Sequence, residues 1–465
     1  MIMERFDAVI IGAGPGGYPC AIRLGQLGKK VAIVEEEELG GECLNFGCIP
    51  SKAIIQISDL YHRTVEASGK GIFDGSPPSP SMKGIQEFKK SVVSKMTRGV
   101  ETLLKGNGVR IFRGRGRIAG RGLVEAAGET IGCDFAVIAT GSKFIELPSL
   151  KFDHKKIINV RDLLSIEKLP GRMLVVGGGY IGLEMGVAMA KLGTRVSVVE
   201  MMPQVMPGTE QEIMRVVDRR LKALGLEIRT RSVVEKAETK GSALVSTVKS
   251  EDGTQSVIES DLILVSVGKK ASTEGLGLES AGVAVDGKGF IITDEQCRTN
   301  ADWIFAVGDV TGAPFLAHRA TAMGKVAAEV IAGQQSAMEQ KAMPYAVFTD
   351  PEIAAVGLTQ SEAEARGIRV KVGKFPFSAS GRATTFGENE GFVKIVARED
   401  DETVVGCQIV GKDSSELISE VALAIEMGAT LDDIALTVHP HPTLPEAVME
   451  AAEAANKRAT HFIVR

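Results

Sequence analysis

Short apolar runs alternate with helix-compatible segments along the first part of the chain. An apolar run at 7–11 is followed by a glycine-rich turn, a helical stretch to about Leu27 and a second apolar run at 31–34. The same order returns as an apolar run at 173–176, a helical stretch to about Leu192 and a run at 196–199. Buried strands that alternate with helices are typical of a parallel sheet. The pattern therefore predicts two βαβ units of one kind.

The remaining pattern predicts further elements and a change of architecture. We expect a surface loop at 75–83, helices at 85–105, 317–331 and 446–458, a linker at 334–343, and strands or strand–turn segments at 133–141, 262–268, 299–309, 391–397 and 403–410. Motifs of the βαβ kind are absent after Tyr345, where strands and helices alternate. That part is predicted to be a separate α+β domain.

The first βαβ unit carries a Gly-x-Gly-x-x-Gly motif at Gly12, Gly14 and Gly17, and its second strand ends at Glu35. In such a motif the first glycine permits a tight turn, the second lets the backbone approach a pyrophosphate, and the third allows close helix packing. The helix start attracts the phosphates, and the acid can accept hydrogen bonds from ribose hydroxyls. Strand, motif, helix and acid together indicate a dinucleotide site.

The second βαβ unit repeats the motif at Gly177, Gly179 and Gly182 and ends at Glu200. In both units the acid stands 23 positions after the first glycine. A purely structural duplication would not need both the glycines and the acid, so the repeat predicts a second dinucleotide.

Two cysteines five positions apart, Cys43 and Cys48, precede a helix-compatible run at 51–60. A disulfide across so short a loop removes little chain entropy and would stabilise the fold weakly. A helix start favours thiolate over thiol. The spacing therefore favours a redox-active dithiol, although two unrelated buried cysteines would give the same spacing. The nearby glycines that give the loop its freedom are Gly40, Gly41 and Gly47.

The position of the dithiol indicates which cofactor each unit binds. It follows the first unit within ten residues, and a flavin can take electrons from a thiolate and remain bound, so FAD is expected there. The second unit should then bind a nicotinamide cofactor. Glu200 would repel a 2′-phosphate, and residues 201–203 contain no Arg or Lys to bind one, which favours NAD over NADP.

Near the C-terminus, His439 and His441 precede the predicted helix that begins at Glu446. Thiol–disulfide exchange needs a base, and histidine titrates in the right range. Glu446 can orient an imidazole as in a catalytic triad. Thr443 and Glu446 also have the spacing of a capping box, and both roles can hold together.

Composition limits the remaining possibilities. A chain of 465 residues suggests about three domains. A net charge of −5 argues against a nucleic acid or anionic membrane partner. Six cysteines with one close pair fit a reducing cytoplasm. The apolar run at 9–11 lacks the basic leader of a signal peptide, and we expect no membrane helix and no metal site.

With these residues in view, the whole chain resembles the pyridine nucleotide–disulfide oxidoreductases. The resemblance rests on Cys-Leu-Asn-x-Gly-Cys-Ile-Pro-Ser-Lys at 43–52 and His-x-His-Pro-Thr-Leu-x-Glu at 439–446. It implies an α/β homodimer with two Rossmann-like domains and a C-terminal α+β dimerisation domain. The implied divisions are an FAD-binding domain at 1–145 and 270–340, an NAD-binding domain at 146–269 and an interface domain at 341–465.

The resemblance also implies roles for individual residues. Cys48 lies beside the flavin, Cys43 exchanges with the substrate, His441 is the base and Glu446 orients it, and the His–Glu pair of one subunit serves the dithiol of the other. In addition to the first glycine motif and Glu35, the residues implied to bind FAD are Lys52, Gly141, Asp309, Ala317 and His318. In addition to the second glycine motif and Glu200, the residues implied to bind NAD are Glu184 and Gly268. Glu184 is implied to pair with Lys52.

The implied activity is oxidation of a dihydrolipoyl dithiol on a carrier domain of a 2-oxoacid dehydrogenase or glycine cleavage complex, with reduction of NAD⁺. An NAD(P)H-dependent disulfide or mercuric reductase of the same family is the alternative. A transhydrogenase would not need the cysteines, and a scaffold subunit would not need the four catalytic residues.

Three departures from the family pattern stand out. Glu42 replaces a common Thr and would tend to raise the pKa of Cys43. Pro445 replaces a common Ser, and residues 269–272 replace a Gly-Arg-x-Pro-Asn pattern, which puts contacts between the nucleotide domains in doubt. Tyr180 could cover the flavin, although that position varies in the family.

Overall fold

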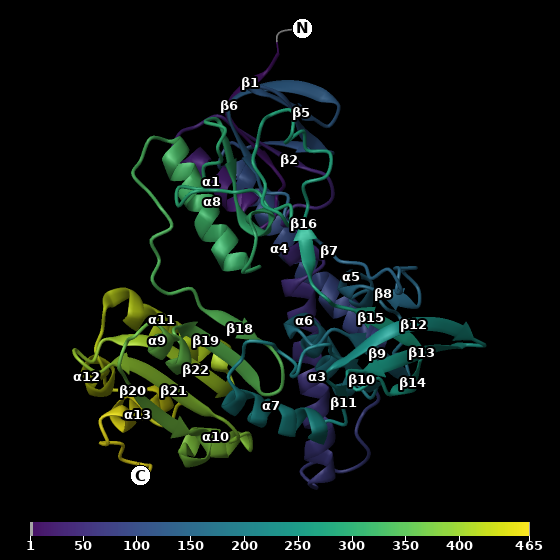
Figure 1. The fold of residues 1–465 in the computed structure, drawn as a ribbon, viewed down its shortest axis with the longest axis vertical. Helices are drawn as coiled ribbons and strands as arrows, with labels where there is room; N and C mark the ends of the chain where they lie inside the picture. The colour runs from purple at the N-terminus through teal and green to yellow at the C-terminus, as the bar shows by residue number, and fades with distance from the viewer. Residues whose placement is uncertain (1–2, 465) are drawn as a thin grey trace. The chain divides into compact units, whose positions relative to one another are not determined.

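The computed structural model describes residues 3–464, which form two compact units (Figure 1). Unit 1 comprises the described residues up to Pro170 together with 236–244 and 261–339. Unit 2 comprises 171–235, 245–260 and the described residues from Gln340 onward. The three-domain division stays a prediction.

Unit 1 is built on a seven-stranded sheet in the order β3-β2-β1-β6-β5-β4, with β17 also paired to β6. Strand β1 lies parallel to β2 and β6, and its alternate residues enter apolar clusters on opposite faces, Ile10 on one and Val9 on the other. A strand with both faces buried needs the continuous apolar run seen at 7–11. The strands are β1 (Arg5–Ile11), β2 (Val31–Glu35), β3 (Arg110–Arg113), β4 (Gly116–Gly120), β5 (Leu123–Ala126), β6 (Glu129–Ile138) and β17 (Ile304–Ala306).

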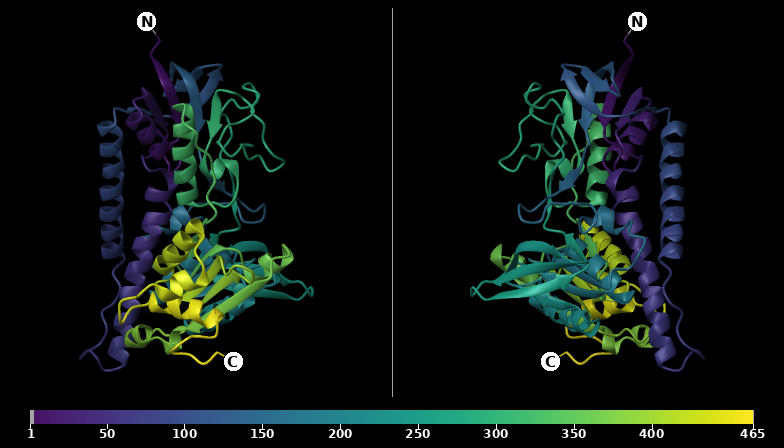
Figure 2. Two further views of the ribbon diagram at one scale, coloured as in Figure 1. Left: turned by 90° about the vertical axis from the view of Figure 1, so that its left-hand side faces the viewer. Right: turned by 90° about the vertical axis from the view of Figure 1, so that its right-hand side faces the viewer.

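Helices α1 (Gly17–Gln26) and α8 (Ala317–Ile331) pack against each other beside this sheet (Figure 1). The short α2 (Gly41–Asn45) leads into α3 (Cys48–Gly69), which lies beside α4 (Met82–Gly106) (Figure 2). The oxygen of Ser81 accepts from Gly84 N–H, so α4 begins at Met82, three residues before the predicted start. The remaining elements of unit 1 are β7 (Ser142–Phe144), β8 (Ile157–Ile158), α5 (Val160–Leu163), β15 (Leu262–Val265), β16 (Lys269–Ala271) and the 3₁₀ turn Gly308–Thr311.

Unit 2 contains the second βαβ unit and the C-terminal sheet. Strand β10 (Arg195–Val199) lies parallel to β9 (Arg172–Val176) and β11 (Glu227–Arg229), and α6 (Tyr180–Lys191) connects β9 to β10. The C-terminal sheet is antiparallel in the order β18-β19-β22-β21-β20. Its strands are β18 (Tyr345–Val347), β19 (Glu352–Gly357), β20 (Val370–Pro376), β21 (Phe392–Arg398) and β22 (Val404–Gly411).

Helices α11 (Ser414–Met427) and α13 (Glu446–Ala455) pack on the C-terminal sheet, and α12 (Leu431–Leu436) packs on α13. The other elements are α7 (Gln211–Ala223), α9 (Gln360–Ala365), α10 (Gly381–Phe386), the 3₁₀ turn Phe377–Ala379 and β14 (Gln255–Ser260). The chain passes from one unit to the other within β12 (Ser232–Lys240) and again within β13 (Ala243–Ser250). Across residues 3–464, every helix is too short or too polar to span a bilayer.

A buried lysine joins the two parts of unit 2. The side chain of Lys394 on β21 is 6% exposed. Its Nζ lies 2.6 Å from Glu212, within α7, and 3.1 Å from Glu210, just before α7. Lys374 also donates to Glu212, at 2.8 Å. Burial raises the pKa of Glu212, but the hydrogen bonds from the two lysines outweigh it and leave this pKa below its usual range.

We expect Lys394→Ala to lower the free energy of unfolding by about 3–5 kcal/mol, because it leaves buried carboxylates without their cation. Thermal and denaturant unfolding of the full chain measure this change. The matched control is Arg369→Ala, whose ion pair with Glu399 is exposed and should contribute under about 1 kcal/mol.

The same cluster predicts a dependence on pH. The pKa of Glu212 is lower in the folded state than in the unfolded state. The contribution of Glu212 to the free energy of unfolding is therefore present above its unfolded pKa and is lost as pH falls through its folded pKa. The stability difference between wild type and Lys394→Ala should therefore shrink at acidic pH, and a difference that grew there would contradict this account.

Candidate redox and dinucleotide sites

The first glycine motif forms a closed turn between β1 and α1. Gly12 has φ +102°, a conformation that side chains rarely adopt. A Cβ on Gly17 would lie 1.9 Å from the carbonyl oxygen of Gly12, so only glycine allows this contact. A Cβ on Gly14 would meet only Gly41 Cα, at 4.0 Å, which leaves space beside the loop. The three positions therefore show the tight turn, the open side and the close helix contact that the motif predicts.

Glu35, the last residue of β2, holds this loop. Its Oε2 accepts from Ala13 N–H at 2.7 Å and its Oε1 accepts from Glu37 N–H at 2.8 Å. Burial raises the pKa of Glu35, and the two backbone hydrogen bonds partly offset that rise. Each carboxylate oxygen has a further lone pair, so the group can still accept from a ribose hydroxyl.

The second motif repeats these contacts. Glu200 Oε2 accepts from Gly178 N–H at 2.6 Å, and its Oε1 accepts from Met202 N–H at 2.8 Å. Gly177 has φ +100°, and a Cβ on Gly179 would meet nothing within 4 Å. Gly182 is buried in α6. The two loops therefore match in sequence, backbone and acid contact, as expected for two dinucleotide sites.

Cys43 and Cys48 come together at the start of α3. Cys48 is its first residue and Cys43 lies in α2. Both are thiols, and a hydrogen bond between them is the main cause that raises the pKa of Cys43, followed by burial. The start of the 22-residue α3 favours negative charge on Cys48. Cys48 is exposed and Cys43 half-buried.

The dithiol loop is attached to the first glycine loop. Gly40 N–H donates to the carbonyl of Ala13 at 2.9 Å. Gly41 lies so close to Gly14 that a Cβ there would be 2.6 Å from Gly14 Cα. These contacts place the cysteines beside the predicted flavin loop, as their sequence position indicated.

Glu42 contacts a cation that the sequence did not reveal. Arg161 Nε lies 3.4 Å from Glu42 Oε2, its Nη2 lies 2.5 Å from Glu37, and its guanidinium lies 3.9 Å from the Phe46 ring centre. Burial raises the pKa of Glu42, and Arg161 opposes the rise.

The other residues expected near FAD gather at one end of the first sheet. Asp309 Oδ2 accepts from Ser142 Oγ at 2.6 Å and lies 3.7 Å from Lys269 Nζ. Lys269 belongs to β16, which pairs with β7. Ala317 and His318 begin α8 as predicted. Gly141, which was also expected near FAD, has positive φ between β6 and β7, and Gly268, which was expected near NAD, has positive φ just before β16.

Lys52 follows Cys48 by one turn of α3, so the two lie on the same face as predicted. Glu184, on α6 in unit 2, is 3% exposed, and its Oε1 accepts from Phe348 N–H at 2.9 Å. The predicted pairing of Lys52 with Glu184 joins residues of different units and stays a prediction. Tyr180 is the first residue of α6 and is exposed.

Glu446 contacts the imidazole as foreseen, but it makes only half of the predicted capping box. Its Oε1 lies 2.9 Å from His441 Nδ1, and its Oε2 accepts from Thr443 N–H at 2.7 Å. The hydroxyl of Thr443 donates to the Pro440 carbonyl instead of completing a capping box. Burial raises the pKa of Glu446, but these hydrogen bonds outweigh it and lower the pKa overall.

The ionised Glu446 fixes the tautomer of His441. A carboxylate only accepts hydrogen bonds, so Nδ1 carries the hydrogen and Nε2 keeps a lone pair. The side chain of His441 is 78% exposed, so Nε2 is available as a base.

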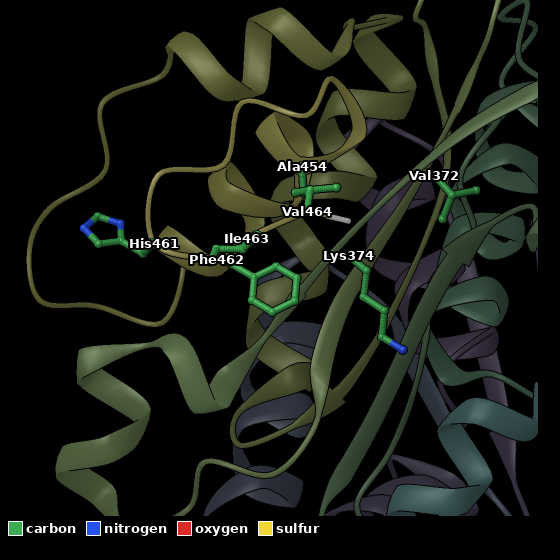
Figure 3. Close-up of a pocket in the computed structure, with 7 residues that line it drawn as sticks. All are labelled: Val372, Lys374, Ala454, His461, Phe462, Ile463 and Val464. Carbon is green, nitrogen blue, oxygen red and sulfur yellow. The ribbon is translucent and has the colours of Figure 1, made fainter.

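A pocket of about 600 Å³ lies at the C-terminal tail (Figure 3) and includes no residue predicted for either site. It is lined by Val372, Lys374, Ala454, His461, Phe462, Ile463 and Val464. His461 points away from Phe462 and pairs with buried Glu450 at 2.5 Å. Spacing gave no signal for this pair, which is made by the chain folding back on α13.

We expect Gly17→Ala to abolish flavin retention, because the new Cβ would lie 1.9 Å from the Gly12 carbonyl oxygen. The flavin-to-protein ratio of the purified protein measures this. The matched control is Gly99→Ala on α4, where a Cβ meets nothing within 4 Å, and it should keep its flavin. Equal flavin content in the two variants would contradict the role of Gly17.

Comparison with known proteins identifies the family of this chain. The family model described as pyridine nucleotide-disulphide oxidoreductase matches residues 6–324, and its dimerisation domain matches 343–452. The chain is 45% identical to dihydrolipoyl dehydrogenase 2 of Haloarcula marismortui over 98% of both chains, and 44% identical to dihydrolipoyl dehydrogenase of Thermus scotoductus over 100% of both. The crystal structure of LpdA from Mycobacterium tuberculosis matches with a TM-score of 0.89, at 28% identity over 97% of this chain and 99% of that one. The chain belongs to the pyridine nucleotide–disulphide oxidoreductase family.

Proposed function

We propose that this protein oxidises a dihydrolipoyl dithiol to the disulfide and reduces NAD⁺ to NADH. The observation that carries the proposal is the hydrogen-bonded pair Cys43–Cys48 at the start of α3, beside a dinucleotide loop. The names of the full-length relatives, which are dihydrolipoyl dehydrogenases, agree with it.

The cofactors are FAD and NAD. FAD, when bound, accepts the electron pair of the dithiol and passes it on to NAD⁺. We assign FAD to the loop of Gly12 and Glu35 and NAD to the loop of Gly177 and Glu200. The space beside Gly14 and Gly179 and the acid at each loop support this assignment.

The two cysteines have different roles in the proposed cycle. In the oxidised enzyme they form a disulfide, and a substrate thiolate attacks Cys43, which releases Cys48 as a thiolate. The second substrate thiol then displaces Cys43, so the substrate becomes a disulfide and the cysteine pair gains two electrons. The raised pKa of Cys43 supports this order, since the proton returns to Cys43 while the start of α3 stabilises charge on Cys48.

His441 moves the protons. Its Nε2 takes the proton of the attacking substrate thiol, and Glu446 stabilises the imidazolium that forms through Nδ1. Lys52, one turn after Cys48, adds positive charge near the thiolate.

The C-terminal dimerisation domain supports a homodimer. We infer that the His441–Glu446 pair of one subunit serves the dithiol of the other, and that the substrate is a lipoyl group on a carrier domain of a 2-oxoacid dehydrogenase or glycine cleavage complex. A cytoplasmic location suits a dithiol that must be reduced in each cycle.

We expect Cys48→Ser to stop reduction of the flavin by dihydrolipoamide. Anaerobic titration of wild type should give a long-wavelength absorbance band, and NADH should appear when NAD⁺ is added. Cys133→Ser changes a buried cysteine outside the site and serves as the control. A Cys48→Ser protein that oxidised dihydrolipoamide at the wild-type rate would refute the proposal.

We expect wild type to prefer NAD⁺ over NADP⁺, since Glu200 places a negative charge where a 2′-phosphate would lie. Glu200→Gln keeps an acceptor for Gly178 N–H and removes the charge, so the preference in kcat/KM should fall by about tenfold or more. An enzyme that was bleached by NADPH and inert to dihydrolipoamide would instead be a reductase of the same family.

A further inference from the structure

His439 lies two residues before the proposed base His441, but its side chain is buried whereas that of His441 is exposed. The side chain of His439 is only 5% exposed. Nδ1 lies 2.7 Å from the carbonyl oxygen of Thr437, and Nε2 lies 2.8 Å from Oε1 of Glu420 on α11. Both ring nitrogens therefore face oxygen atoms at hydrogen-bond distance.

These contacts determine where the hydrogens are. A carbonyl oxygen only accepts, so Nδ1 of His439 must carry a hydrogen. An ionised Glu420 also only accepts, so Nε2 must carry a second hydrogen, and the ring is then an imidazolium. The side chain of Glu420 is 34% exposed to water, which favours its ionised form over a neutral acid.

Another titratable group near Glu420 is Cys407 on β22. Burial and the charge of Glu420 raise the pKa of this fully buried thiol, so it remains neutral and does not compete for the carboxylate. The side chain in hydrogen-bond contact with Glu420 is that of His439.

The ion pair attaches the segment that carries the base to the body of unit 2. Residues 437–445 connect α12 to α13, and Leu444 anchors the far end of this segment in the C-terminal core. The near end runs past Leu436 and Val438, which are 80% and 92% exposed. The pair His439–Glu420 joins this near end to α11.

We propose that His439 is a positioning residue that stays positively charged at neutral pH and holds the segment bearing His441 against α11. It is not a second base, because neither nitrogen has a lone pair to offer. The consequence for turnover rests on the proposed function, whereas the protonation state does not.

Nitrogen-15 NMR of the histidine-labelled holoenzyme tests the charge. We expect both ring nitrogens of His439 to be protonated between about pH 7 and 8. Assignment uses His439→Gln and His441→Gln. A His439 ring with one unprotonated nitrogen at pH 7 would overturn the proposal.

Steady-state kinetics test the positioning. His439→Gln should lower kcat with dihydrolipoamide by about tenfold or more with KM changed less than about twofold, because a displacement of 1 Å can cost about a hundredfold. NADH oxidation with ferricyanide, which does not need His441, should be unchanged. Glu420→Gln should have a similar effect, and the double variant should be no worse than either single one.

The matched control is His154→Gln, which removes an exposed His–Asp pair in unit 1 and should leave both activities unchanged. If His439→Gln keeps kcat within twofold, or loses both activities equally, His439 does not position the base. If wild type fails to oxidise dihydrolipoamide, the proposed function is wrong. The change in the NMR shift of His441 caused by His439→Gln then still decides whether the His439–Glu420 pair positions His441.

Discussion

A carboxylate at the end of a strand holds each glycine loop, and the two proposed dinucleotide sites depend on this contact. Glu35 binds Ala13 N–H and Glu200 binds Gly178 N–H, each through Oε2. The loop can close in this way only because its first glycine has positive φ. In unit 1 the held loop also receives the dithiol segment through the bond from Gly40 to Ala13. One hydrogen bond therefore positions a cofactor loop and the cysteines beside it.

The chemistry then depends on where protons are held. The hydrogen bond between the two sulfurs, together with burial, raises the pKa of Cys43. Glu446 fixes the hydrogen of His441 on Nδ1 and leaves Nε2 open. His439, two residues earlier, has an acceptor at each nitrogen. Residues of one type thus acquire different functions from their partners, because the partner decides which atom can still accept a proton.

Periodicity and motif spacing predicted those elements and contacts whose residues lie close together in the sequence. Helix α8 has the predicted bounds 317–331, and the glycine loops and the His441–Glu446 contact were expected from spacing. Helix α7 and strands β12 to β14 were not predicted, since no motif marks them. Arg161 and Lys394 were also missed. Lys394 lies 182 residues from Glu212, and a contact over that distance leaves no periodic signal in the sequence.

The family departures show why a local substitution need not change a site. Glu42 brings a carboxylate next to Cys43, which by itself would disfavour a thiolate there. The structure places Arg161 against that carboxylate, and Lys269, at a second departure, lies near both Glu42 and Asp309. The added negative charge is therefore met by two cations of unit 1. The raised pKa of Cys43 is then caused mainly by Cys48 and by burial, which are features of the dithiol itself.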